Sequence, residues 1–111
     1  MNKTIEDIIS RRSVKKYLDK DVPLELVEQV VKAGTYAPSG MNKQSAIIIA
    51  VTNKEMRDRL SRMNADVLGT TADPFYGAPV VLIVLAKKDV NTFIYDGSLV
   101  MGNLMLAAHS L

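Results

Sequence analysis

Seven consecutive residues near the start of the chain carry its densest set of side chains suited to binding a phosphate. The segment Arg11-Arg12-Ser13-Val14-Lys15-Lys16-Tyr17, which we call the basic stretch, places four cations and a serine hydroxyl together. Guanidinium, ammonium and hydroxyl groups are the donors with which proteins hold phosphates. A solvated helix end is the alternative, because cations in a last helical turn interact favourably with the helix dipole without any ligand. The residues alone leave both interpretations open.

A second polar segment, residues 37–44, follows one predicted helix later, and we call it the polar loop. Pro38 and Gly40 interrupt any regular structure there. The loop also carries three side chains that offer directional hydrogen-bond donors and acceptors: Ser39, Asn42 and Gln44. The polar loop is therefore the second candidate for binding chemistry.

Apolar residues at helical spacing predict the helices that position these two segments. The first has Thr4 as its N-cap and ends near the basic stretch. The second has Pro23 as its first residue, and Gly34 followed by Pro38 is predicted to stop it. The third starts at Asn53, and its spacing predicts an apolar inner face made of Met56, Leu60, Met63 and Val67.

A fourth helix is predicted from about Thr92, and from Leu99 onward it is apolar on almost every side. Such a helix belongs in the interior of a protein or at a subunit interface. It reaches Leu111 with neither a glycine cap nor a closing polar turn. We therefore expect residues 1–111 to be the N-terminal part of one domain that is truncated at its C-terminus.

Two continuous apolar runs, residues 46–52 and 80–85, predict strands that are buried on both faces. Strands and helices in this order predict a mixed α+β fold, with a sheet flanked by helices.

Composition excludes several classes of function. The net charge of the 111-residue chain is +2, with acids and bases interleaved, which argues against a nucleic-acid partner. The absence of cysteine excludes disulfides and thiolate chemistry. No secretory signal or membrane-spanning run is visible, so we expect a cytoplasmic protein with no membrane partner. The single histidine, His109, has no partner at the spacing of a metal site or catalytic triad.

Five motifs together resemble the FMN-dependent nitroreductase family. They are the basic stretch, the polar loop, Tyr76-Gly77-Ala78-Pro79 before the second strand, Asp96-Gly97-Ser98, and the run from Asn103 to Ala108. The resemblance implies a nitroreductase-like fold and a homodimer with FMN at the subunit interface. It also implies hydride transfer from NAD(P)H through the flavin to a nitroaromatic, quinone or similar acceptor.

The resemblance assigns roles to individual residues. Arg11 and Ser13 match positions that contact the FMN phosphate and ribityl chain, and Arg12 lies in the same segment. Lys15 matches a lysine at the pyrimidine edge of the flavin ring, where a cation favours hydride acceptance. No catalytic side chain is implied, because the cofactor carries the chemistry.

The polar loop matches a segment that touches the flavin from the other subunit. The matching positions are Pro38, Ser39, Gly40, Asn42 and Gln44. One departure follows the loop, since Ser45-Ala46 stands where many members carry Pro-Trp, so the packing beneath the loop is expected to differ. Two alternatives stay open: a catalytically inactive dimerising remnant, and a small phosphate- or anion-binding module that uses residues 11–16.

Overall fold

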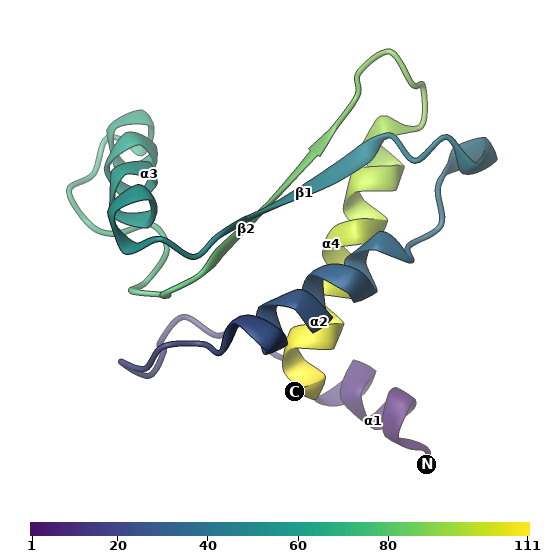
Figure 1. Cartoon of the computed structure of the whole chain (residues 1–111), viewed down its shortest axis with the longest axis horizontal. Helices are drawn as coiled ribbons and strands as arrows, with labels where there is room; N and C mark the ends of the chain where they lie inside the picture. Colours follow the sequence, from purple (N-terminus) through teal and green to yellow (C-terminus); the bar gives the residue numbers. More distant parts are fainter.

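Two helices open the chain, and two strands and two further helices then follow in alternation; the computed structural model describes all residues, Met1–Leu111. Figure 1 shows their arrangement in space. The helices are α1 (Lys3–Ser10), α2 (Leu24–Thr35), α3 (Lys54–Leu68) and α4 (Phe93–Ser110), with a short 3-10 helix at Gly40–Asn42. The strands are β1 (Ala46–Val51) and β2 (Val81–Ala86).

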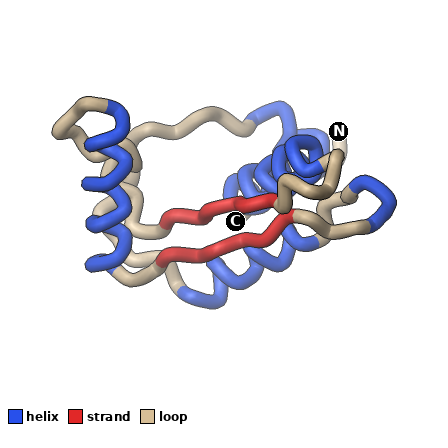
Figure 2. Tube along the Cα trace, turned by 90° about the horizontal axis from the view of Figure 1, so that it is seen from above, coloured by secondary structure: helices blue, strands red, loops and turns tan.

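The two strands form one antiparallel pair, in which Ala46 faces Ala86 and Val51 faces Val81. Helix α3 and the loop after it connect the strands, and α3 lies beyond one end of the pair, whereas α2 and α4 lie towards the other end (Figures 1 and 2). The predicted mixed α+β class with helices around a sheet is confirmed.

Only one face of the sheet is covered, so the prediction of strands buried on both faces is wrong. Ile48 and its cross-strand partner Val84 pack against the helical core. Their neighbours Ile47 and Leu85 point to the other face, and 58% and 50% of their respective surfaces are exposed. The apolar run reflects two apolar faces, but α2 and α4 supply a cover for one of them only.

The core lies where α2 crosses α4. Val30 of α2 and Val100 and Leu104 of α4 are buried together there. Gly34 allows the close approach, because a Cβ atom on it would lie 2.5 Å from Leu104 Cδ2. The helix ends at Thr35, between Gly34 and Pro38 as predicted, and the glycine also serves packing.

Helix α3 buries a polar face instead of the predicted apolar one. Met56, Met63 and Val67 are exposed and Leu60 is half-buried, whereas the buried residues are Arg57, Ser61 and Ala65. Arg57 is buried because Asp73, in the following loop, supplies a partner for its charge. The predicted start at Asn53 is confirmed, since its side chain accepts a hydrogen bond of 2.9 Å from the amide of Met56.

Helix α1 begins two residues earlier than predicted. Asn2, not Thr4, is the N-cap, and its side chain accepts a hydrogen bond from the amide of Ile5. The other end of α1 contacts the end of α4, where Ser10 Oγ lies 2.9 Å from His109 Nε2. In the second helix, Pro23 is likewise the N-cap and not the first helical residue.

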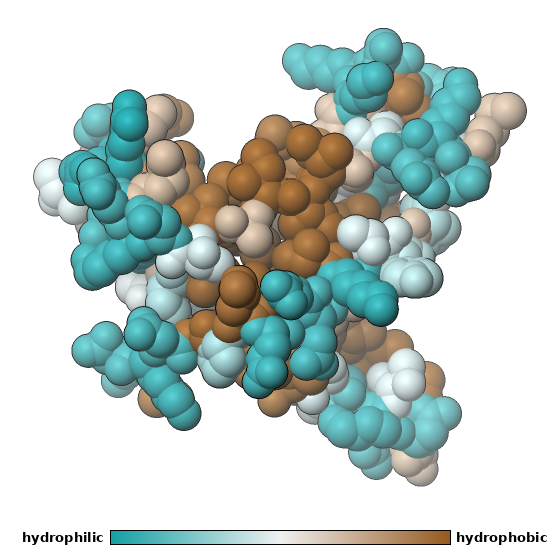
Figure 3. Space-filling model, in the orientation of Figure 1, coloured by the Kyte–Doolittle hydropathy of each residue, from teal (hydrophilic) through white to brown (hydrophobic).

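The chain is more open than its length predicts. Its radius of gyration is 15.1 Å, whereas a compact domain of this length has about 13 Å. Its accessible surface is 8464 Å², against about 6,100 Å² for a compact monomer of this mass. Figure 3 shows apolar surface across the middle of the molecule, where the strands and α4 lie. None of the helices combines the length and apolarity needed to cross a membrane.

Candidate functional site

The basic stretch is not helical. It follows α1 directly, and residues 11–23 form an extended connection to α2. Arg12 Nη1 donates hydrogen bonds of 2.8 Å to the carbonyl of Ile9 and 2.9 Å to that of Arg11. Arg12 thus stabilises the end of α1, as the solvated helix-end interpretation expects for one of the cations. The side chains of Arg11, Ser13 and Lys15 make no hydrogen bond or ion pair within the chain.

A cavity of about 360 Å³ lies between the basic stretch and the loop that precedes β2. Lys15 Nζ lies 6.0 Å from the centre of the Tyr76 ring across it. The basic stretch contributes Ser13, Val14, Lys15 and Tyr17 to the cavity wall, and the loop contributes Pro74, Phe75 and Tyr76. Cationic and aromatic groups on facing walls suit a planar ligand that carries negative charge.

Asp73 fixes the loop on the far wall of this cavity. Its carboxylate accepts hydrogen bonds from Arg57, from Ser61 Oγ at 2.7 Å, and from the amides of Phe75 and Gly77 at 2.9 and 2.7 Å. Burial of the carboxyl opposes ionisation, but these hydrogen bonds outweigh it and hold the pKa of Asp73 well below its ordinary value. Apolar spacing and short motifs give no sign of this cluster, because its members lie up to 20 residues apart.

The polar loop lies at the other end of α2 and forms a tight turn. Ser39 Oγ accepts a hydrogen bond of 3.0 Å from the amide of Gln44, and Gln44 Nε2 donates one of 3.2 Å to Asn42 Oδ1. Met41, Asn42 and Gln44 all adopt positive φ, at 52°, 55° and 51°. Non-glycine residues rarely adopt this backbone conformation, so the loop is held in a specific and strained shape.

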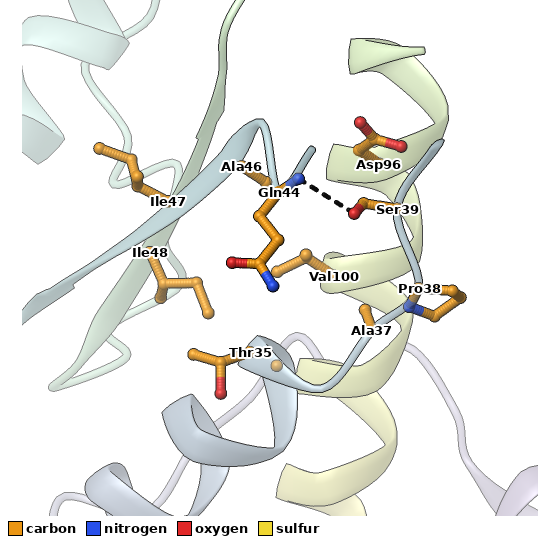
Figure 4. Close-up of a pocket in the computed structure, with 11 residues that line it drawn as sticks. Thr35, Ala37, Pro38, Ser39, Gln44, Ala46, Ile47, Ile48, Asp96 and Val100 are labelled. Atoms are coloured by element: carbon orange, nitrogen blue, oxygen red, sulfur yellow. Dashed lines mark hydrogen bonds between the residues drawn. The ribbon is translucent and has the colours of Figure 1, made fainter. Parts of the chain in front are cut away.

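A cavity of about 430 Å³ lies beside the polar loop, between β1 and α4 (Figure 4). The side chain of Gln44 extends into it, and Asp96 lies next to Ser39 at its rim. The loop contributes Ala37, Pro38, Ser39 and Gln44 to the wall, and the other elements contribute Gly34, Thr35, Ala46, Ile47, Ile48, Asp96 and Val100.

Asp96 is the most deeply buried large side chain, with 2% of its surface exposed. It accepts hydrogen bonds from Ser45 Oγ at 2.7 Å, from the Gly40 amide at 2.9 Å and from Thr92 Oγ1 at 3.0 Å. The bonds from Ser45, Gly40 and Thr92 lower its pKa, and burial opposes them less strongly. Ser45 is the residue at which the sequence departs from the Pro-Trp pattern noted above. Its hydroxyl bonds Asp96, so the packing beneath the loop depends on it. An aspartate and a threonine four residues apart, opening an apolar helix, are the signal that could have revealed this cluster.

The structure divides the predicted site residues between the two cavities. Ser13 and Lys15 share one cavity, and Pro38, Ser39 and Gln44 share the other. Arg11, Arg12, Gly40 and Asn42 belong to the same two segments but line neither cavity. Helix α2 separates the segments, and its 12 residues span about 18 Å. One chain therefore does not bring the basic stretch and the polar loop together.

Other candidate chemistry is absent from the chain. No three His, Asp or Glu side chains lie close enough to share a metal ion. His109 contacts Ser10 on the surface and has no acidic partner.

Comparison with known proteins identifies the family. A sequence model described as the nitroreductase family matches residues 8–68, a range that contains both the basic stretch and the polar loop. The chain belongs to the nitroreductase family. A Methanothermobacter thermautotrophicus protein, named for a proposed NADH dehydrogenase or NAD(P)H nitroreductase activity, is 31% identical over 116 residues, which cover 96% of this chain.

Solved nitroreductases share the fold of this family member. The Bacteroides fragilis nitroreductase with bound FMN superposes with a TM-score of 0.88 at 28% identity, covering 99% of this chain. The Desulfitobacterium hafniense nitroreductase with bound FMN gives 0.87 at 27% identity, again over 99% of the chain. The chain spans 56% of the length of the Methanothermobacter relative and 66% of each of these two solved chains.

Proposed function

We propose that this chain binds FMN at the interface of a homodimer and forms part of an NAD(P)H-dependent oxidoreductase. Its electron acceptors would be nitroaromatics, quinones or similar small molecules. Membership of the nitroreductase family supports the reaction class, and the FMN bound by the Bacteroides and Desulfitobacterium nitroreductases supports the cofactor. The division of the site between two ends of α2 supports the dimer.

The side chains of the two segments fit the chemistry of FMN. Arg11 and Ser13 have free donors for the phosphate and the ribityl hydroxyls, with Arg12 beside them. Lys15 lies over an aromatic ring at the edge of a cavity, where an ammonium group can meet the polar edge of a planar ring. The polar loop offers the Ser39 hydroxyl, the backbone of Pro38 and Gly40, and the amides of Asn42 and Gln44, which suit the heteroatoms of such a ring.

The separation of the basic stretch from the polar loop is the main support for a site shared between two subunits. A two-fold axis beside α4 would pair the polar loop of one copy with the basic stretch of the other. The accessible surface exceeds that of a compact monomer by about 2,400 Å². Obligate homodimers bury about 2,000–5,000 Å² in total. Exposed apolar side chains on α4, among them Ile94, Leu99 and Met101, provide the surface for such an interface.

Bound FMN would supply hydride acceptance from NAD(P)H and electron delivery to the acceptor. The chain would orient the flavin and supply the positive charges that stabilise it. Lys15 would stabilise negative charge that develops at the pyrimidine edge, and Arg11 would neutralise the phosphate. The protein's part in this proposal is to bind the flavin and to stabilise its charge.

A flavin-binding assay tests the cofactor. Protein that is mixed with FMN and then separated from free flavin by gel filtration should stay yellow, and the absorbance should bleach when NADPH or NADH is added without oxygen. Arg11→Ala should weaken binding of FMN but not of riboflavin, which lacks the phosphate, and Lys88→Ala serves as a control for loss of an exposed cation. Protein that takes up no flavin would overturn the proposal and favour the remnant or the anion-binding module.

Mixed dimers test whether two chains build one site. Arg11→Ala and Ser39→Ala chains are each expected to bind FMN weakly. If the basic stretch and the polar loop come from different subunits, a dimer of one variant with the other contains one intact site. Mixing and re-equilibrating the two variants should then restore tight FMN binding, measured by flavin fluorescence quenching. No gain over the separate variants would contradict the shared site.

A further inference from the structure

Asp96 is a buried carboxylate without a cationic partner. It lies in the first turns of α4 and takes part in no ion pair. Its hydrogen bonds come from two hydroxyls and one backbone amide, and no buried side-chain nitrogen or oxygen in the chain lacks a partner. A charge held in this way is costly to bury unless its donors are fixed in place. Such a residue requires an explanation beyond general packing.

Two of the donors bracket the C-terminal half of the polar loop: one lies within the loop and the other directly follows it. The Gly40 amide lies at the start of the short 3-10 helix, and Ser45 directly precedes β1. Thr92, the third donor, precedes α4 and also closes the space around Gly40, because a Cβ on that glycine would lie 2.3 Å from Thr92 Oγ1. Asp96 thereby ties residues 40 and 45 to one rigid helix.

The loop between these two anchors needs such a constraint. Met41, Asn42 and Gln44 hold positive φ, which a free loop would relax. Most of the loop's surface is exposed. Its internal hydrogen bonds are two backbone bonds that close the short 3-10 helix and the two made by Gln44, to Ser39 and to Asn42. Strained residues persist where the surroundings fix them, and Asp96 is the group that connects this loop to the core.

We propose that Asp96 is a positioning residue for the flavin ring: from α4 it holds the backbone of residues 39–44 in the shape that contacts the cofactor. This inference rests on the proposed function. It assigns a role to a residue outside both the basic stretch and the polar loop, and the role acts through Gly40 and Ser45. Because the loop would contact the ring and not the phosphate, loss of Asp96 should weaken FMN and riboflavin equally.

The first measurement needs no flavin. Amide hydrogen exchange is compared between the parent chain and Asp96→Asn, which keeps the shape but removes a charge that accepts three hydrogen bonds. The Gly40 and Gln44 amides should exchange faster in the variant, whereas the Thr70 amide, bonded to Ala65 at the end of α3, should not change. Asp89→Asn, an exposed aspartate that precedes α4, is the matched control and should change none of these amides.

The second measurement is the affinity for FMN and for riboflavin. Asp96→Asn should weaken both by the same factor, about tenfold, as expected for a buried polar cluster left partly unpaired. Thr92→Val removes one donor at constant shape and should give a smaller loss, and Thr92→Ser should restore the parent affinity. The Thr92 variants keep the test valid if Asp96→Asn does not fold.

Each outcome decides the assignment. Faster exchange at Gly40 together with equal losses for FMN and riboflavin supports it. A parent chain that binds flavin and an Asp96→Asn variant that binds it equally well overturn the positioning role alone. The role is also overturned if FMN weakens and riboflavin does not, because the effect then concerns the phosphate. A parent chain that binds neither compound overturns the proposed function and the flavin role of Asp96 together.

Discussion

Two aspartates hold the loops at opposite ends of the sheet, and they do so with different partners. Asp73 binds the guanidinium of Arg57 as well as a hydroxyl and two amides, and 30% of its side chain stays exposed. Asp96 binds only neutral donors and is almost fully buried. One loop is thus held by an ion pair together with three neutral donors, and the other is held by neutral donors alone.

Removal of Arg57 should have the largest effect on stability. Arg57→Ala leaves Asp73 without its counter-charge and also removes the hydrogen bond of 2.7 Å to the carbonyl of Ala78. We expect a loss of about 3 kcal/mol, the low end for breaking a buried ion pair, because Asp73 is partly hydrated. Urea unfolding measures it. Arg59→Ala, on the exposed side of the same helix, should change stability by less than about 0.5 kcal/mol; equal losses would contradict the role of the pair.

A side chain added at Gly40, which lies at the other end of the sheet, should have the next largest effect on stability. A methyl group in Gly40→Ala would collide with Thr92, and all three of the nearest atoms belong to that side chain. We expect a loss of about 1–3 kcal/mol. Gly102→Ala, which has open space around it in the middle of α4, should stabilise by about 0.5–1 kcal/mol.

A double-mutant cycle checks the cause of that loss. In a Thr92→Ala background the two closest atoms, Oγ1 and Cγ2, are gone and only the Cβ of residue 92 stays, at 2.8 Å, so Gly40→Ala should cost less than in the parent chain. The free energy of unfolding of the four proteins gives the coupling energy. A value near zero would mean that Gly40 is sensitive for some other reason, such as its backbone conformation.

Two serines sharpen the comparison, because each donates a hydrogen bond of 2.7 Å to one of the aspartates. Ser61→Ala should cost about 1 kcal/mol, since Asp73 keeps Arg57 and two amides. Ser45→Ala should cost more, because Asp96 then keeps only Gly40 and Thr92. Thermal unfolding of both variants against the parent measures the difference. The reverse order would show that the lack of a cation does not make Asp96 more dependent on its donors.

These clusters also show where prediction from sequence ends. Apolar spacing located all four helices and both strands, and the motifs located both polar segments of the candidate site. The same spacing assigned Met56 and Met63 to the inside of α3, since it does not register that Arg57 has a partner 16 residues later. The prediction that both faces of the strands are buried failed for a similar reason. The pattern shows that Ile47 is apolar, but not whether another element covers it.

A change of pH should have the smallest effect near neutrality, and it separates the two aspartates on acidification. Both have a pKa below the ordinary value of 3.8. Their stabilising contribution is thus fully present above about pH 5 and is lost as pH falls through the folded-state pKa. The shift at Asp73, with its guanidinium, is the larger one. The Gly40 amide bonds Asp96 and the Gly77 amide bonds Asp73, so their NMR shifts report each carboxylate. On acidification, the amide shift of Gly40 should change at a higher pH than that of Gly77, because Asp96 should take up its proton first. The reverse order would mean that neutral donors hold a carboxylate as firmly as Arg57 does.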